Sequence, residues 1–212
     1  MQYTIRRSDR ARRVRVVVEP TGAIEVVLPR RSAQREAAAA VAELRPWIER
    51  RLAEAQVVRA AVEGRGDELP YLGTTLRARC EPGRTRAHRR GDQLLFGDRL
   101  QVERWYRRMA REEVAPLLDE AVDALGVSYA SVRIANQRTR WGSCSTTGAM
   151  SFNWRLLLAP PEILDYVVWH EACHLVHMDH SRRFWSLLEC HLPDYRTPRR
   201  WLKDHGATLV LG

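Results

Sequence analysis

Branched apolar residues and polar residues alternate near the start of the chain. They recur at every second position on both sides of a turn at Pro20–Thr21–Gly22: Val14, Val16 and Val18 before it, and Ile24, Val26 and Leu28 after it. Period-two alternation around a glycine turn predicts a β-hairpin, with Arg13 and Arg15 on its outer face. Short strands are expected again over residues 69–72, 75–80, 86–89 and 93–96, each followed by a glycine turn.

Segments with helical periodicity lie between these strands and after them. Apolar residues at helical spacing predict a helix after Ser32, which Pro46 kinks or breaks, and a long helix over 102–125 that ends at Gly126. Strands are expected at 127–134 and 150–158. Three further helices are predicted after Pro160–Pro161, over 181–191 and over 199–205. Because the pattern changes from strands to helix near residue 101, we expect an α+β chain with a β-rich N-terminal region over 1–100 and a second domain over 101–212.

Positive charge is concentrated in the first of these regions. The 212 residues include 35 Lys and Arg and 26 Asp and Glu, for a net charge of +9, and residues 1–100 contribute 21 basic and 13 acidic residues, or +8. Every basic residue except Lys203 is arginine. The guanidinium fork binds phosphate in a bidentate manner, so one interpretation is a nucleotide or nucleic-acid partner. The other interpretation is solvated strand faces.

Several classes of protein are excluded or disfavoured by composition. A hydrophobic content of 45% is too high for a disordered chain. The longest apolar runs, such as 156–161, are too short to span a bilayer, and Met1–Arg13 lacks the apolar core of a secretory signal. The four cysteines show no CxxC spacing, which is typical of reduced thiols. We therefore expect a cytoplasmic protein with no membrane partner.

The chemistry of the chain is indicated by His170-Glu171-x-x-His174. Positions i and i+4 share one face of a helix, so both imidazoles can bind one zinc ion, and Glu171 can act as general base on a water. The alternative is two hydrogen-bonded histidines with no metal.

A catalytic zinc site needs a third protein ligand. His180 is favoured over His177, because Asp179 and Ser181 can form the turn that brings His180 back to the helix.

Three segments together resemble a known family: RWGSCS at 140–145, SFNWR at 151–155 and HEACHLVHMDHSRRFW at 170–185. Over about residues 136–202 the chain is similar to the YgjP-like metal-dependent hydrolases, which resemble SprT-like and WLM zinc metallopeptidases. The resemblance implies one Zn²⁺ held by His170, His174 and His180, with Glu171 as the catalytic acid and base. It also implies a zincin-like domain with a small mixed sheet, in which Ser151–Leu157 borders the cleft and offers its edge to a peptide.

The RWGSCS segment allows two interpretations. In one, Arg140 and Asn153 bind the substrate, with Arg140 in contact with an anion, and Cys144 approaches the metal. In the other, the segment is a structural turn in which Gly142 allows a tight bend. Three functions follow from the sequence: a zinc metallopeptidase for peptides or unfolded proteins, a metal-dependent nucleoside triphosphate pyrophosphohydrolase, and a DNA-associated protease recruited by the basic half.

Overall fold

The structure, a computed structural model, describes residues 1–19, 22–137 and 139–211. The described residues form an α+β architecture of six α-helices and three small sheets, which confirms the predicted fold class. They divide into two compact units, Met1–Gly64 and Arg65–Leu211. Each unit has its own apolar core.

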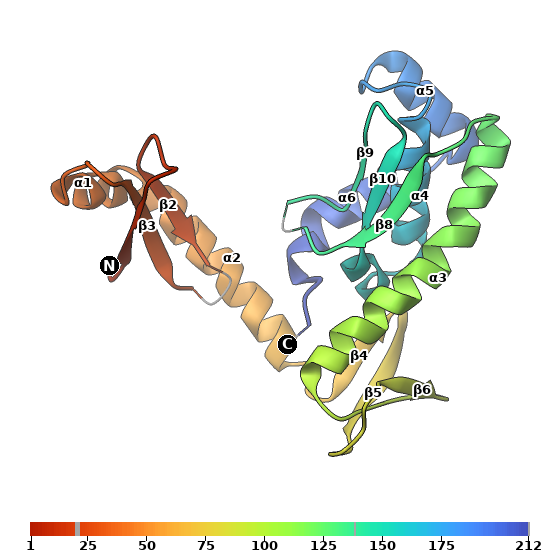
Figure 1. Cartoon of the computed structure of the whole chain (residues 1–212), viewed down its shortest axis with the longest axis horizontal. Coiled ribbons are helices and arrows are strands. Elements are labelled where there is room, and N and C mark those ends of the chain that lie inside the picture. The colour runs from red at the N-terminus through yellow and green to blue at the C-terminus, as the bar shows by residue number, and fades with distance from the viewer. Residues whose placement is uncertain (20–21, 138, 212) are drawn as a thin grey trace. The chain divides into compact units, whose positions relative to one another are not determined.

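The first unit combines a three-stranded sheet with two helices (Figure 1). The sheet has the order β1-β3-β2, with strands β1 (Thr4–Ser8), β2 (Arg15–Val18) and β3 (Ile24–Pro29). Strands β2 and β3 pair antiparallel, which confirms the predicted hairpin; Pro20 and Thr21 of its turn lie outside the described residues. Strand β1, which the pattern did not predict, pairs parallel with β3.

The helix predicted after Ser32 is two helices, α1 (Arg35–Glu43) and α2 (Arg45–Glu63). They are separated at Leu44, and Pro46 stands in the first turn of α2, where its missing N–H has no partner to lose. Val41 and Ile48 are buried against the apolar face of β3.

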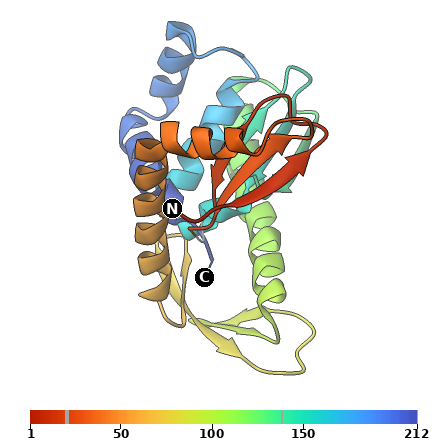
Figure 2. The same cartoon turned by 90° about the vertical axis from the view of Figure 1, so that its left-hand side faces the viewer.

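The second unit begins with a four-stranded sheet of order β4-β5-β7-β6. Its strands are β4 (Glu68–Tyr71), β5 (Thr74–Cys80), β6 (His88–Arg90) and β7 (Gln93–Phe96), all close to their predicted positions. The long helix α3 (Arg99–Leu125) follows, and Figure 2 shows the sheet at one end of it. Pro116 lies inside α3, and Gly126 ends the helix in the left-handed conformation, as expected.

The sheet and α3 share one core, which places the division of the chain earlier than the sequence pattern does. Tyr71 of β4 packs against Trp105 and Tyr106 of α3, and the Tyr106 hydroxyl donates to the Pro70 carbonyl. The change from strands to helix near residue 100, where we expected a boundary, therefore lies inside the second unit, because tertiary packing rather than secondary structure defines a compact unit.

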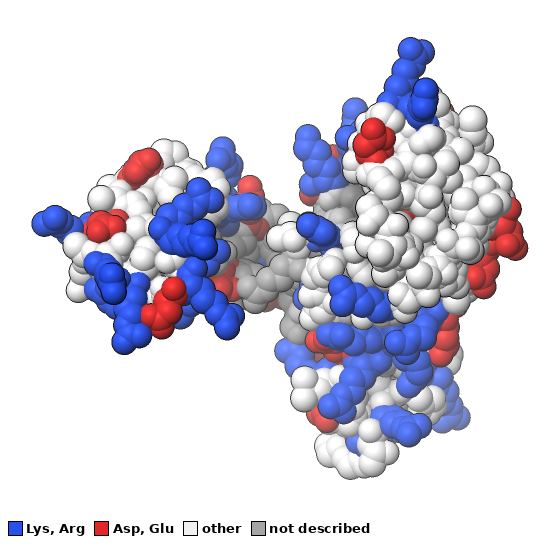
Figure 3. Space-filling model, turned by 45° about the horizontal axis from the view of Figure 1, so that its top comes forward, with Lys and Arg blue, Asp and Glu red and all other residues white. Residues whose placement is uncertain are grey.

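Arginine side chains lie on the surface of both units. Figure 3 shows Lys and Arg gathered over the Met1–Gly64 unit and around the four-stranded sheet. On that sheet and its turns the exposed arginines are Arg77, Arg79, Arg86, Arg89 and Arg90. A nucleotide or nucleic-acid partner for this charge stays a prediction.

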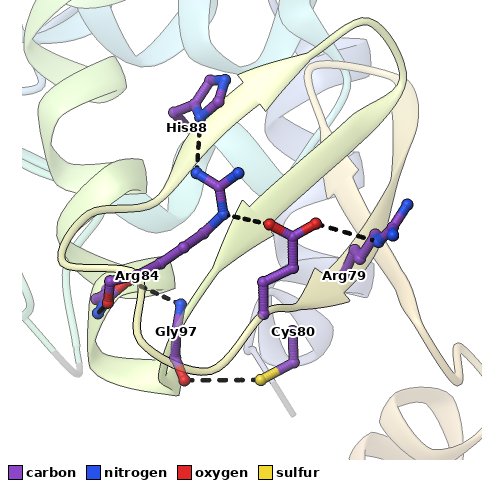
Figure 4. Close-up of polar contacts among 7 residues, drawn as sticks. Arg79, Cys80, Arg84, His88 and Gly97 are labelled. Atoms are coloured by element: carbon purple, nitrogen blue, oxygen red, sulfur yellow. Dashed lines mark hydrogen bonds and ion pairs between the residues drawn. The ribbon is translucent and has the colours of Figure 1, made fainter.

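Part of the arginine charge is paired within the sheet itself (Figure 4). The Glu81 carboxylate lies between Arg84, at 2.6 Å, and Arg79, at 3.3 Å. The Gln101 side chain of α3 accepts from the Gly97 N–H and donates to the Arg84 carbonyl, both at 2.8–2.9 Å. This network joins the strand ends to the first turn of α3.

A second, mixed sheet follows α3. It consists of β8 (Ser131–Ala135), β9 (Gly142–Cys144) and β10 (Ala149–Asn153), with β10 in the centre, parallel to β8 and antiparallel to β9. The strand that we predicted over 151–157 ends at Asn153, and residues 154–158 form the 3-10 helix η1 (Trp154–Leu158). The Asn153 side chain caps η1 by accepting the Arg155 N–H, so the backbone turns away from the sheet. Because β10 is paired on both sides, the predicted strand offers no free edge to a peptide; the edges of the described sheet are β8 and β9.

Helix α4 (Pro161–Cys173) packs against α3, against β9 and against the last two helices, α5 (Arg182–His191) and α6 (Arg196–His205). The 3-10 helix η2 (Gly206–Thr208) is the last element of the described residues. Ile163, Leu164, Val167 and Val168 of α4 are almost completely buried, so the helix is fixed in the core. No helix within the described residues is long and apolar enough to cross a membrane.

Candidate metal centre

Helix α4 carries the first two histidines to the edge of the core. His170 and Glu171 lie in its last turn, and His174 is the residue at which the helix ends. The chain then forms a tight turn, in which the His177 N–H donates to the Cys173 carbonyl at 2.9 Å and the Val176 N–H donates to the same oxygen. The helix is therefore a few residues shorter than the sequence indicates, and the turn after it begins at His174.

This turn brings His180 to the two helix histidines. One ring nitrogen from each of His170, His174 and His180 lies within 4.8 Å of the others, and Nε2 of His170 and Nε2 of His180 are 3.0 Å apart. His177 contributes its backbone instead, since its carbonyl accepts a hydrogen bond from Nδ1 of His174 at 2.9 Å. That bond leaves the lone pair of His174 on Nε2.

Helix α5 supports all three imidazoles. The ring of Phe184 is completely buried and lies 4.5–4.9 Å from the rings of His170, His174 and His180. Trp185 donates its indole N–H to the His180 carbonyl at 3.1 Å, which holds the turn in place. The Phe-Trp pair of the sequence motif thus positions the cluster.

The cluster has the chemistry of a cation site. Burial lowers the pKa of His170 to about 3, with smaller contributions from His174, His180 and Arg199. Burial also lowers the pKa of His174. Neutral imidazoles present lone pairs, and Nδ1 of His170 is buried with no hydrogen-bond partner within the described residues. Three converging nitrogen donors fit the divalent ion that the family comparison below implies.

Glu171 lies beside the cluster against strand β9. It is 7% exposed, and burial raises the pKa of its carboxyl to about 7, while Arg140 and a backbone hydrogen bond from Cys144 act in the opposite direction. Its side chain occupies the space above Gly142, where a Cβ would stand 2.5 Å from Oε1. The Gly142 of the RWGSCS segment therefore makes room for the carboxylate.

A cavity of about 520 Å³ opens over these groups. Its floor is α4, and β9 with the preceding residues forms one wall. Three ionisable lining residues were not found from the sequence: Tyr166, Arg199 and Lys203. Tyr166 precedes His170 by four positions, so helical periodicity could have found it. Arg199 and Lys203 belong to α6, whose position depends on tertiary packing.

The sequence also offers Arg140, Cys144 and Asn153 as candidates, and the structure places two of them in the cavity lining and one outside it. Arg140 lines the cavity, and its positive charge acts to lower the pKa of the Glu171 carboxyl. Cys144 lines the cavity too, but its sulfur is not part of the three-histidine cluster, and burial raises the pKa of its thiol.

Asn153 lies outside the cavity lining. It is 3% exposed, and its amide donates to the Gln137 carbonyl at 2.7 Å and to the Arg140 carbonyl at 3.1 Å. It therefore holds the loop that carries Arg140.

Comparisons with known families and with solved structures gave matches. The sequence model of a family described as "YgjP-like, metallopeptidase domain" matches residues 12–205. Among solved structures, the metallopeptidase zymogen abylysin of Pyrococcus abyssi is 26% identical, with a TM-score of 0.39, over 43% of this chain and 93% of that one. The comparison with curated proteins gave no match.

Proposed function

Because the chain belongs to the YgjP-like metallopeptidase family, whose members are metal-dependent hydrolases, we propose that it is a zinc endopeptidase acting on extended or unfolded protein segments. The observation that carries the proposal is the convergence of His170, His174 and His180 beside a buried carboxylate, at the floor of an open cavity.

His170, His174 and His180 would hold the ion. When bound there, Zn²⁺ supplies a Lewis acid that polarises a carbonyl and makes water a better nucleophile. Glu171 accepts a proton from the attacking water at its carboxylate and delivers it to the leaving amine nitrogen. In the metal-free protein burial raises the pKa of this carboxyl to about 7, and a cation bound beside it favours the carboxylate form that accepts the proton.

Two further features favour an extended peptide as substrate. Strand β9 is paired on one side only within the described sheet, so its free edge can receive a peptide by strand addition next to Glu171. Tyr166 lines the same cavity, and burial raises the pKa of its phenol to about 12, so it remains a hydrogen-bond donor.

The test compares Glu171→Gln with Glu162→Gln, which changes an exposed carboxylate in the first turn of the same helix. We expect Glu171→Gln to bind zinc and to cleave unfolded casein at least about 100-fold more slowly, as the loss of a general base implies. The control should keep both properties. Undiminished cleavage by Glu171→Gln would contradict the role given to this residue.

The same preparations are incubated with nucleoside triphosphates, since the cavity also contains the cations Arg140, Arg199 and Lys203. The sequence has no GxxxxGK[ST] phosphate loop, which favours the peptide. Release of phosphate or pyrophosphate without any peptide cleavage would replace the peptidase by the nucleotide hydrolase as the function.

A further inference from the structure

Helix α6 forms a cationic wall of the cavity. Arg199 and Lys203 are four residues apart, so they share one face of the helix, and both line the cavity together with Leu202. Arg140 lies on the β9 side of the same cavity. Among the described lining residues Glu171 is the only acid, and it is the group assigned above to proton transfer.

Arg199 is held close to the histidine cluster. Its guanidinium carbon lies 4.6 Å from the centroid of the Trp185 ring, and Trp185 is bonded to the His180 carbonyl.

The charges of Arg199 and Lys203 have no carboxylate partner within the described residues. Arg196, three residues before Arg199 on the same helix, pairs with Glu189 at 2.7 Å and does not line the cavity. Unpaired cations on one wall of an open cavity create a positive potential that attracts an anionic group of the substrate.

We propose that Arg199 and Lys203 form a subsite for a carboxylate of the substrate, so that the protein preferentially cleaves peptide bonds close to an Asp or Glu side chain or to a free C-terminus. The proposal rests on the proposed function and names its substrate class. The guanidinium supplies two parallel donors to a carboxylate and the ammonium a compact charge, and the cavity has room for a side chain next to the scissile bond.

The experiment uses the zinc-loaded full chain. Cleavage sites in unfolded casein are first mapped by mass spectrometry. Blocked peptides are then built around one cleaved bond with Glu, Gln or Lys at the two positions on each side of it, and a further Gln peptide carries a free C-terminal carboxylate. We expect kcat/KM to be about three- to tenfold higher for a carboxylate-bearing peptide than for the blocked Gln peptide. A preference for the Glu peptides indicates recognition of a side chain, and a preference for the peptide with the free C-terminus indicates recognition of the terminal carboxylate.

Variants of Arg199 and Lys203 test whether these two residues cause the preference for carboxylate-bearing peptides. Arg199→Gln and Lys203→Gln should bring the Glu-to-Gln ratio of kcat/KM toward one, and Lys203→Glu should favour the Lys peptide. The two Lys203 variants should disturb the packing of the site less, since Arg199 also packs on Trp185. The matched control is Arg200→Gln, an exposed residue of the same helix that does not line the cavity, and it should keep the ratio.

A ratio near one in the unaltered protein, or a ratio that both Gln variants leave unchanged, would overturn the subsite while the peptidase function stands. If no peptide is cleaved, the proposed function fails, and binding decides the inference. Fluorescent versions of the same peptides are then titrated against zinc-loaded Glu171→Gln. Tighter binding of the carboxylate peptides that Lys203→Gln abolishes would support the subsite. Equal binding of all peptides, or tighter binding of a nucleoside triphosphate than of any peptide, would reject it.

Discussion

Gly142 of β9 lies directly against the side chain of Glu171. A Cβ at position 142 would stand 2.5 Å from Cγ and Oε1 of Glu171 and 2.8 Å from Cδ, closer than non-bonded atoms approach. The φ of Gly142 is not in the left-handed region, so an alanine is compatible with the backbone there. The glycine is required by the neighbouring carboxylate and not by the turn.

Gly142→Ala should therefore impair catalysis more than folding. The methyl group displaces the Glu171 carboxylate, and a misplacement of about 1 Å at a reacting group costs on the order of 100-fold in rate. We expect a loss of this size in peptide cleavage, with the zinc content of the unaltered protein. Steady-state kinetics and elemental analysis measure the two quantities. A variant as active as the unaltered protein would show that the carboxylate can move without consequence.

His180 and His177 give a second, paired prediction. His180→Ala should weaken zinc binding at least about 100-fold, because it removes one of the three nitrogen donors. Losing a residue that only supports a ligand would cost less. His177→Ala should keep the affinity, since His177 meets the cluster through its backbone carbonyl. Titration against a competing chelator measures both. Similar losses in the two variants would contradict the cluster of three.

Removal of zinc should lower the melting temperature of the unaltered protein, because an ion that binds only the folded state stabilises it. His180→Ala should show a much smaller shift on chelation. Thermal unfolding with and without chelator provides the measurement, and equal shifts in the two proteins would mean that the stabilising metal is bound elsewhere.

Asn153 is expected to act through the loop that it holds. Asn153→Ala leaves the Gln137 and Arg140 carbonyls without this donor, which should lower the free energy of unfolding by about 1–3 kcal/mol and reduce peptide cleavage without loss of zinc. Asn136→Ala, an exposed change in the same loop, should remain within about 0.5 kcal/mol. Urea unfolding compares the variants, and equal stabilities would argue against the loop contact.

Two buried groups make the stability of the metal-free protein depend on pH with opposite signs. His170 has a pKa of about 3 when folded, against 6.5 for a free histidine, so the unfolded state takes up the extra proton and stability falls as the pH drops from about 6.5 toward 3. Glu171 has a pKa of about 7 against 4.5, so the folded state holds the extra proton and stability falls as the pH rises from about 4.5 to 7.

Glu171→Gln removes the second effect only. Relative to the unaltered metal-free protein, the variant should gain stability as the pH rises from 4.5 to 7, by up to about 3 kcal/mol. Urea unfolding at a series of pH values measures the difference. Parallel pH profiles of the two proteins would show that the Glu171 carboxyl is not perturbed by its burial.

Sequence periodicity predicted the elements whose signals are long or repeated. The β2–β3 hairpin, the break before Pro46 and the length of α3 all agree with the pattern. The pattern missed β1 and β9, because a few residues with no alternation carry no period. The pattern predicts a strand over the apolar run after Asn153, which is a 3-10 helix, since continuous apolar residues do not distinguish a strand from a buried helical turn.

The sequence by itself determined that His170 and His174 share a helix face with Glu171 beside them, because helical geometry is local and its period is written in the chain. Tertiary structure decided the rest of the candidate site. It places His180 rather than His177 next to the helix histidines, sets Gly142 against Glu171, and brings Arg199 and Lys203 of α6 to the cavity. These relationships join segments separated along the chain, and such contacts depend on how buried faces pack rather than on any spacing between neighbouring residues.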